Sequence, residues 1–193
     1  RLIYEDSQGQ FWFGTRSGYL YRYDQSLKVV HTLKIKDDIP ICMIEDRKKR
    51  LWLGVRKKGL MISTNNGKSF SQVDLGETVN SVYDLLIDRK NRLWAASFQK
   101  GFFVADLNAT NLKFEHIPFE IINHNYIRVI HQDHTGLIWA GTNEGILVFN
   151  PDDLLKDHRH FINFRFDLRD PNSLSNNEVK AICEDSKGNL WFG

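Results

Sequence analysis

Three side chains that often bind metals or transfer protons lie close together in the segment His131-Gln132-Asp133-His134. Imidazole and carboxylate groups at this spacing could hold a zinc ion or act as acid and base. Both kinds of residue, however, also occupy places in a repeat described below, where Asp133 begins a turn. We therefore interpret His131 as a packed strand residue and His134 as an exposed turn residue.

Adjacent carboxylates recur as Glu5-Asp6, Glu45-Asp46 and Glu184-Asp185, and paired carboxylates could serve glycoside hydrolysis. Neighbouring strand residues point to opposite faces, so recurrence favours a structural turn instead. Cys42 and Cys183 fall in separate repeats, whereas a disulfide needs Cα atoms within ~7 Å. We predict two free buried cysteines, no catalytic residue, no metal site and no cofactor.

Composition limits the class of protein. The chain has 193 residues, 41% hydrophobic and 26% charged, enough for one domain that buries roughly 70% of its unfolded surface. The net charge of +2 argues against a nucleic-acid partner. Since no apolar run reaches the ~20 residues of a membrane span, we expect no membrane contact by this segment. The first residue is not Met, which indicates a piece of a longer protein.

A repeat built on tryptophan organises the chain. The tryptophans are 40 to 52 residues apart; each has an Asp six residues before it, an apolar residue nine before it, and Gly or Ala two after it. The tryptophans are Trp12, Trp52, Trp94, Trp139 and Trp191, and the aspartates are Asp6, Asp46, Asp88, Asp133 and Asp185. Asp185-Ser186-Lys187-Gly188 fits a type I turn between two strands, whereas Lys49 and Asn91 replace the turn glycine in two repeats.

Four short antiparallel strands per repeat are typical of a β-propeller blade. We predict an all-β fold: a partial β-propeller over residues 1–193 with four blades plus half of a fifth, a fragment of a seven-bladed propeller. A closed four-bladed ring is the alternative. The blade repeats cover about 1–38, 39–78, 79–123, 124–176 and 177–193. The segment Ser63–Phe70 resembles an Asp-box hairpin, which we interpret as a structural turn.

The sequence Ile-Cys-Glu-Asp-Ser-Lys-Gly-Asn-Leu-Trp-Phe-Gly at 182–193, preceded by Asn172-Ser173-Leu174-Ser175, resembles the two-component regulator propeller repeat. The segment from Tyr4 to Thr15 matches it again. The resemblance implies the periplasmic sensor region of a hybrid two-component regulator of the Bacteroidetes type, where two seven-bladed propellers precede a β-sandwich, a membrane helix and histidine kinase modules. It further implies a membrane-anchored, homodimeric parent, a non-enzymatic domain, and an oligosaccharide ligand released from glycans.

By analogy with other propellers, the ligand would lie on loops that join strand two to strand three and one blade to the next. Arginine, lysine, amide and aromatic side chains there suit sugar hydroxyls and acidic groups, so an acidic glycan is favoured. The candidate ligand-binding residues are Arg16, Arg56, Lys58, Gln99, Lys100, His124, Asn125, Tyr126, Asn143 and Glu144.

Two other functions stay open at this point. One is a protein-interaction scaffold. The other is a metal-dependent enzyme of the streptogramin lyase type, for which the candidate face offers only His124, Glu77 and Glu144. The basic turns 47–50 and 89–92 lie on the opposite face, and we interpret them as solvated.

Overall fold

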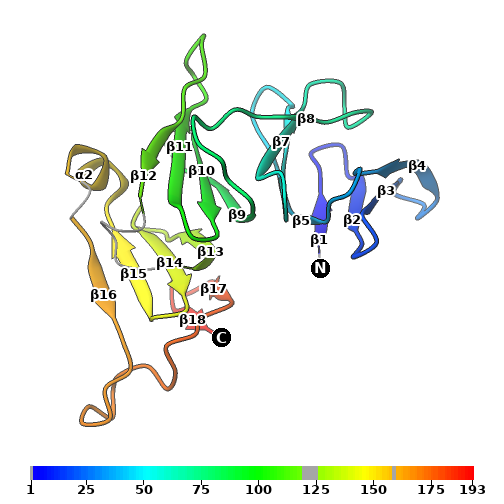
Figure 1. The fold of residues 1–193 in the computed structure, drawn as a ribbon. Helices are drawn as coiled ribbons and strands as arrows, with labels where there is room; N and C mark the ends of the chain where they lie inside the picture. The colour runs from blue at the N-terminus through cyan, green and yellow to red at the C-terminus, as the bar shows by residue number, and fades with distance from the viewer. Residues whose placement is uncertain (1, 119–125, 158–159) are drawn as a thin grey trace.

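A computed structural model describes residues 2–118, 126–157 and 160–193, and these form five antiparallel sheets in chain order (Figure 1). We call the sheets blades 1 to 5. Blade 1 comprises β1 (Leu2–Glu5), β2 (Phe11–Gly14), β3 (Tyr19–Tyr23) and β4 (Val29–Lys34). Blade 2 comprises β5 (Pro40–Glu45), β6 (Leu51–Val55), β7 (Leu60–Ser63) and β8 (Ser71–Gln72).

The later blades follow the same order. Blade 3 comprises β9 (Val82–Ile87), β10 (Arg92–Ser97), β11 (Gly101–Asp106) and β12 (Glu115–Ile117). Blade 4 comprises β13 (Ile127–Gln132), β14 (Ile138–Thr142), β15 (Ile146–Phe149) and β16 (Ile162–Phe164), with the helix α2 (Pro151–Lys156) before its last strand. Blade 5 has β17 (Ile182–Glu184) and β18 (Leu190–Phe192).

The first strands of the blades contact one another around an axis, from β1 through β5, β9 and β13 to β17. The blades therefore radiate from that axis along an arc (Figure 1). They do not close into a ring, because Ile3 at the start is 69% exposed and Trp191 at the end is 64% exposed. The all-β prediction of four propeller blades and half of a fifth is confirmed.

The repeated tryptophans of blades 1 to 4 each contact the next blade. Trp12, Trp52 and Trp94 are fully buried. The Trp94 ring lies 5.6 Å from the ring of Phe149, which comes from the next blade. Each of these three buried indoles thus stabilises two blades at once by burying a large aromatic surface.

The repeated aspartate fastens each first turn to its tryptophan. In blade 3, Asp88 accepts hydrogen bonds from the backbone N–H groups of Lys90 and Arg92 at 2.9 Å and from Nε1 of Trp94 at 3.0 Å. Equivalent indole bonds join Asp6, Asp46, Asp133 and Asp185 to the tryptophans of their own blades. The turn carboxylate is therefore a structural group in every blade.

In blades 2, 4 and 5, the residue before the repeated turn aspartate forms a hydrogen bond with the preceding blade. Glu45 accepts a hydrogen bond from the backbone N–H of Ser7 at 2.7 Å, and Gln132 accepts one from Arg89 at 2.9 Å. Glu184 likewise accepts from His134, and its carboxylate also faces Nε2 of His131 at 3.2 Å. In the pairs Glu45-Asp46 and Glu184-Asp185, the glutamate thus makes an interblade contact and the aspartate an intrablade contact. Within the described residues, no three metal-binding side chains form a group.

Lys49 adopts a left-handed backbone with φ of 61°, and Asn91 adopts one with φ of 62°, where other turns use glycine. This conformation costs a branched-chain or long side chain roughly 1–2 kcal/mol, partly offset by the entropy that glycine loses on folding. We expect Lys49→Gly to raise the free energy of unfolding by about 0.5–1 kcal/mol in urea titrations. Arg47 does not have a positive φ, so Arg47→Gly should lower the free energy of unfolding. A lower free energy of unfolding in both variants would contradict this account.

The Asp-box-like hairpin has the predicted structural role. Its Gly67 lies against the ring of Trp12 so closely that a Cβ atom would collide with the indole. Arg22 from blade 1 donates a hydrogen bond to the carbonyl oxygen of Asn66 at 2.8 Å. The hairpin therefore closes the junction between blades 1 and 2.

Two expectations need correction. Both cysteines are free, but Cys183 is exposed, because no blade covers blade 5; Cys42 is half-buried, and burial raises the pKa of its thiol. The basic turns are not simply solvated. Lys48 donates to the carbonyl oxygen of Leu107 at 2.9 Å, and Lys90 pairs with Asp152 at 2.6 Å.

Candidate ligand site at the propeller axis

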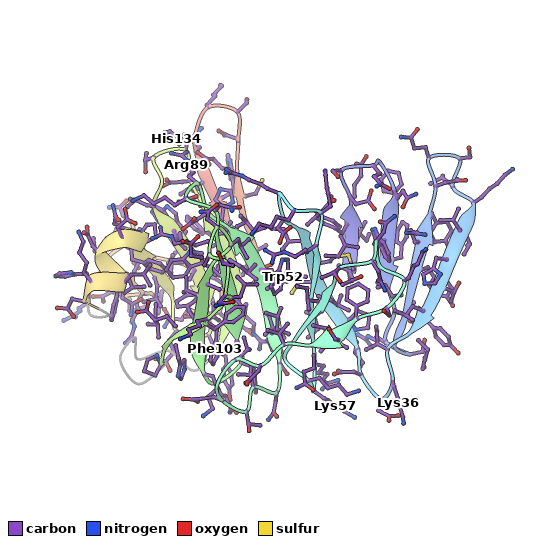
Figure 2. All side chains as sticks on the ribbon, turned by 90° about the horizontal axis from the view of Figure 1, so that it is seen from above. Lys36, Trp52, Lys57, Arg89, Phe103 and His134 are labelled. Carbon is purple, nitrogen blue, oxygen red and sulfur yellow. The ribbon has the colours of Figure 1, made fainter. Side chains whose placement is uncertain are left out.

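The arc of blades has two ends. Figure 2 shows Lys36 and Lys57 on one side of the molecule and Arg89 and His134 on the opposite side. We call the first side the loop end, because it holds the strand two to strand three loops and the blade connections. A cavity of about 400 Å³ opens among the residues of this end. Its lining residues are Arg16, Ile39, Pro40, Ile41, Arg56, Tyr83 and Arg128.

Three lining residues lie on β-bulges of the innermost strands. The bulged residues are Ile41, Tyr83 and Arg128. The two residues on either side of each one pair with consecutive residues of the blade's second strand, so the bulged residue itself has no pairing partner. A bulge bends the strand and redirects the unpaired side chain. All three occupy the same place, eleven residues before the blade's tryptophan. Successive blades thus turn one equivalent residue each toward the axis.

Backbone hydrogen bonds hold the loops beside these bulges. Arg56 donates from its N–H to the carbonyl oxygen of Ile39 at 3.1 Å. Phe98 donates likewise to Ser81 at 2.9 Å. Arg16 and Arg56 share one repeat position, four residues after the tryptophan, which Phe98 and Asn143 occupy in blades 3 and 4.

Aromatic rings form the side of the site next to blades 3 and 4. The rings of Phe98 and Tyr126 stack with centroids 4.3 Å apart, and Tyr83 lies 5.6 Å from Phe98. The guanidinium carbon of Arg128 lies 5.2 Å from the Tyr83 ring centre and 5.9 Å from that of Tyr126. Arg128 is therefore held against two aromatic faces.

The site is cationic. Among the described residues, no carboxylate lines the cavity of Arg16, Arg56 and Arg128. A second cavity of about 370 Å³ shares Arg16 and Arg56 and includes both Asp37 and Asp38. The Asp38 carboxylate already accepts hydrogen bonds from backbone N–H groups, which are those of Ile39, Lys57 and Lys58.

One buried carboxyl group supports the bulges from behind. Asp84 follows Tyr83 and accepts a hydrogen bond from the backbone N–H of Ile130 at 2.8 Å, which joins β9 to β13. It also accepts from Leu85 at 2.9 Å. Burial raises the pKa of Asp84 to about 6, although these two hydrogen bonds act in the opposite direction.

The structure brings together some of the residues predicted from sequence. Arg16 and Arg56 line the cavity. Tyr126 belongs to the aromatic side, where Nε2 of Gln99 lies 3.4 Å from its hydroxyl oxygen, and Asn143 donates from its backbone N–H to Tyr126. His124 and Asn125 lie outside the described residues.

Three predicted residues are engaged elsewhere. Lys58 donates to the carbonyl oxygen of Lys36 at 2.6 Å. Lys100 pairs with Glu77 at 3.4 Å, and Glu144 pairs with Arg165 at 3.3 Å. Glu77 also faces Nδ1 of His116 at 3.0 Å, so neither glutamate named for a lyase-type site points to the axial cavity.

Sequence reasoning missed Tyr83 and Arg128, because it places the ligand on loops, whereas both residues lie on innermost strands. A signal was present. The position nine residues before each tryptophan is always apolar, whereas the position eleven before it holds Ile41, Tyr83, Arg128 and Lys180. A repeat position whose residue type varies among otherwise similar blades does not need to pack in the apolar core.

Three segments of the chain, residues 1–17, 121–144 and 173–193, match the family described as "Two component regulator propeller". The match covers these three segments and not the whole chain. The matched segments contain the turns and first strands of blades 1, 4 and 5. No curated protein matches the chain.

Several solved structures have a similar, propeller-like fold. The extracellular domain of the putative hybrid two component system BT4673 from B. thetaiotaomicron has a TM-score of 0.79 and 23% identity, over 100% of this chain and 25% of that one. The corresponding domain of BT3049 from the same organism has a TM-score of 0.74 and 24% identity, over 98% and 25%. The chain thus spans about a quarter of these relatives.

A virginiamycin B lyase from Staphylococcus aureus is also similar, with a TM-score of 0.74 and 12% identity, over 99% of this chain and 61% of that one. At these identities the structural likeness shows a shared fold.

Proposed function

We propose that this chain is part of a ligand-sensing propeller domain of a hybrid two-component regulator. It binds an oligosaccharide outside the cytoplasm, in the periplasm, and passes the signal to a histidine kinase elsewhere in a membrane-anchored, dimeric parent protein. The single observation that carries the proposal is the convergence of bulged residues from three blades on one cavity. The repeat family and the extracellular two-component relatives support the sensory role.

The chemistry of the cavity suits a sugar. Tyr83 and the stacked pair Phe98 and Tyr126 offer flat apolar faces to the C–H groups of a pyranose ring. Arg16 and Arg56 offer hydrogen-bond donors to its hydroxyl groups. A concave site with aromatic walls and a few oriented polar groups is the usual form of a small-molecule site.

The same residues favour binding over turnover. The described cavity lining consists of arginine, tyrosine, proline and isoleucine, and among these residues there is no nucleophile or carboxylate paired with a base, as hydrolytic catalysis uses. In the described part of the chain, no helix has the length and hydropathy of a membrane span. The proposal therefore places both the membrane anchor and the kinase in other parts of the parent protein.

A glycan array followed by calorimetry tests the proposal with the 193-residue chain. We expect saturable binding of at least one class of oligosaccharide, weakened about tenfold in Tyr83→Ala by the loss of one stacking face. Arg47→Ala is the matched control, since Arg47 is exposed on the turn at the opposite end. Binding that Tyr83→Ala leaves unchanged would place the ligand elsewhere, and an array without any bound glycan would contradict the proposal.

A further inference from the structure

We propose that the ligand carries an anionic group, a carboxylate or a sulfate, and that Arg128 is the residue that selects it. This inference rests on the proposed function, because it assigns the ligand class of the same cavity. It concerns a residue of the innermost strand, outside the loops on which the sequence places a ligand.

Positive charge converges on the cavity from three blades. Arg16 comes from blade 1, Arg56 from blade 2 and Arg128 from blade 4. Like charges that share a site repel one another, and the repulsion is stronger where protein displaces water. An anionic ligand would neutralise part of this charge, whereas a neutral ligand would leave it unchanged.

Arg128 has unused hydrogen-bonding capacity. Its Nε is buried and has no acceptor among the described residues. Its ion pair with Glu178 is 3.7 Å long, whereas charge-assisted hydrogen bonds are about 2.7–2.9 Å. A buried donor without an acceptor is a cost to the unliganded protein, and an oxyanion that reaches it would remove that cost.

The guanidinium group is already oriented. Its contacts with the rings of Tyr83 and Tyr126 hold the plane in position, so little side-chain entropy is lost on binding. Carboxylate and sulfate oxygens match the fork of N–H donors that arginine presents and lysine lacks. A bidentate pair formed there would discriminate between an acidic sugar and its neutral counterpart.

Glu178 does not need Arg128 to remain paired. Nζ of Lys180 lies 2.8 Å from the other carboxylate oxygen of Glu178. When the anionic group of the ligand takes the place of Glu178 beside Arg128, Lys180 continues to neutralise the glutamate. The exchange therefore leaves no carboxylate without a cation.

Matched pairs of probes test the inference by calorimetry. One pair is a galacturonate trisaccharide and its methyl ester; the other is a 6-O-sulfated galactose oligosaccharide and its unsulfated form. We expect at least one acidic probe to bind tenfold or more tightly than its neutral partner, and the stronger pair identifies the anion. Arg128→Ala should weaken that acidic probe by about 10- to 100-fold and leave the neutral one unchanged.

Two further variants keep the test decisive. Arg128→Met retains the packing of the side-chain stem if the alanine variant unfolds, and Arg128→Lys should give an intermediate loss because it keeps only a point charge. Arg47→Ala removes one positive charge at the opposite end and should change nothing. Equal affinities within both pairs, unaffected in Arg128→Met, would overturn this inference and leave the proposed function standing. Absence of binding to every glycan of the array would overturn both.

Discussion

Replacing Asp88 with alanine should lower the free energy of unfolding by about 2–4 kcal/mol, the largest loss we expect from a single substitution in this chain. The Asp88 carboxylate accepts four hydrogen bonds, two from backbone N–H groups, one from Nε of Arg92 at 2.6 Å and one from the indole of Trp94. Alanine would leave a buried indole N–H without its acceptor and would remove one of two carboxylates that pair with the largely buried Arg92 guanidinium, which keeps its ion pair with Asp152 at 2.7 Å. Chemical denaturation followed by tryptophan fluorescence measures the loss.

Blade 5 supplies the matched control. Asp185 accepts the same kinds of hydrogen bond, including one from the indole of Trp191 at 3.1 Å, but this tryptophan is exposed. Water can replace the lost acceptor there, so Asp185→Ala should cost much less than Asp88→Ala. Equal losses in the two variants would show that the turn itself, and not burial of the indole and guanidinium, determines the stability.

The sequence predicts the fold well because one physical unit is repeated five times. An aspartate that caps a turn and bonds to an indole six residues later constrains three positions at once, so the pattern survives where individual residues change. The glycine of the turn is the weakest part of that pattern. Lys49 and Asn91 adopt the left-handed conformation because the flanking strands and the aspartate fix the turn without it.

The candidate site is predicted only in part. Arg16 and Arg56 lie in loops that start at a fixed distance from the tryptophan, so their place at the axis follows from the repeat. The bulges at Tyr83 and Arg128 follow from the pairing register of two strands, which residue types alone do not specify. Lys58 does not line the cavity, because its Nζ donates a hydrogen bond to the carbonyl oxygen of Lys36, a contact that depends on tertiary structure.

The second large effect concerns Asp84 and the acidity of the medium. Its carboxyl group joins the innermost strands of blades 3 and 4 through the N–H of Ile130, directly beside the bulged Tyr83. Burial disfavours the charged form, and the pKa is raised from 3.8 to about 6. Between these values the folded protein binds a proton that the unfolded chain releases, so stability contributed by Asp84 is present below pH 4 and is lost as the pH rises to 6.

A shift of this size corresponds to a loss of about 3 kcal/mol between pH 4 and pH 7, at about 1.4 kcal/mol for each pKa unit. Other groups titrate in the same range, so the quantity to measure is the difference in unfolding free energy between the wild type and Asp84→Asn. We expect the wild type to lose stability relative to Asp84→Asn as the pH rises from 4 to 6. We also expect the carboxyl carbon of Asp84 to titrate near pH 6 by nuclear magnetic resonance. A difference that stays flat across this range, with a midpoint near pH 4, would mean that water reaches Asp84 and that the two innermost strands are joined by an ordinary ionised carboxylate.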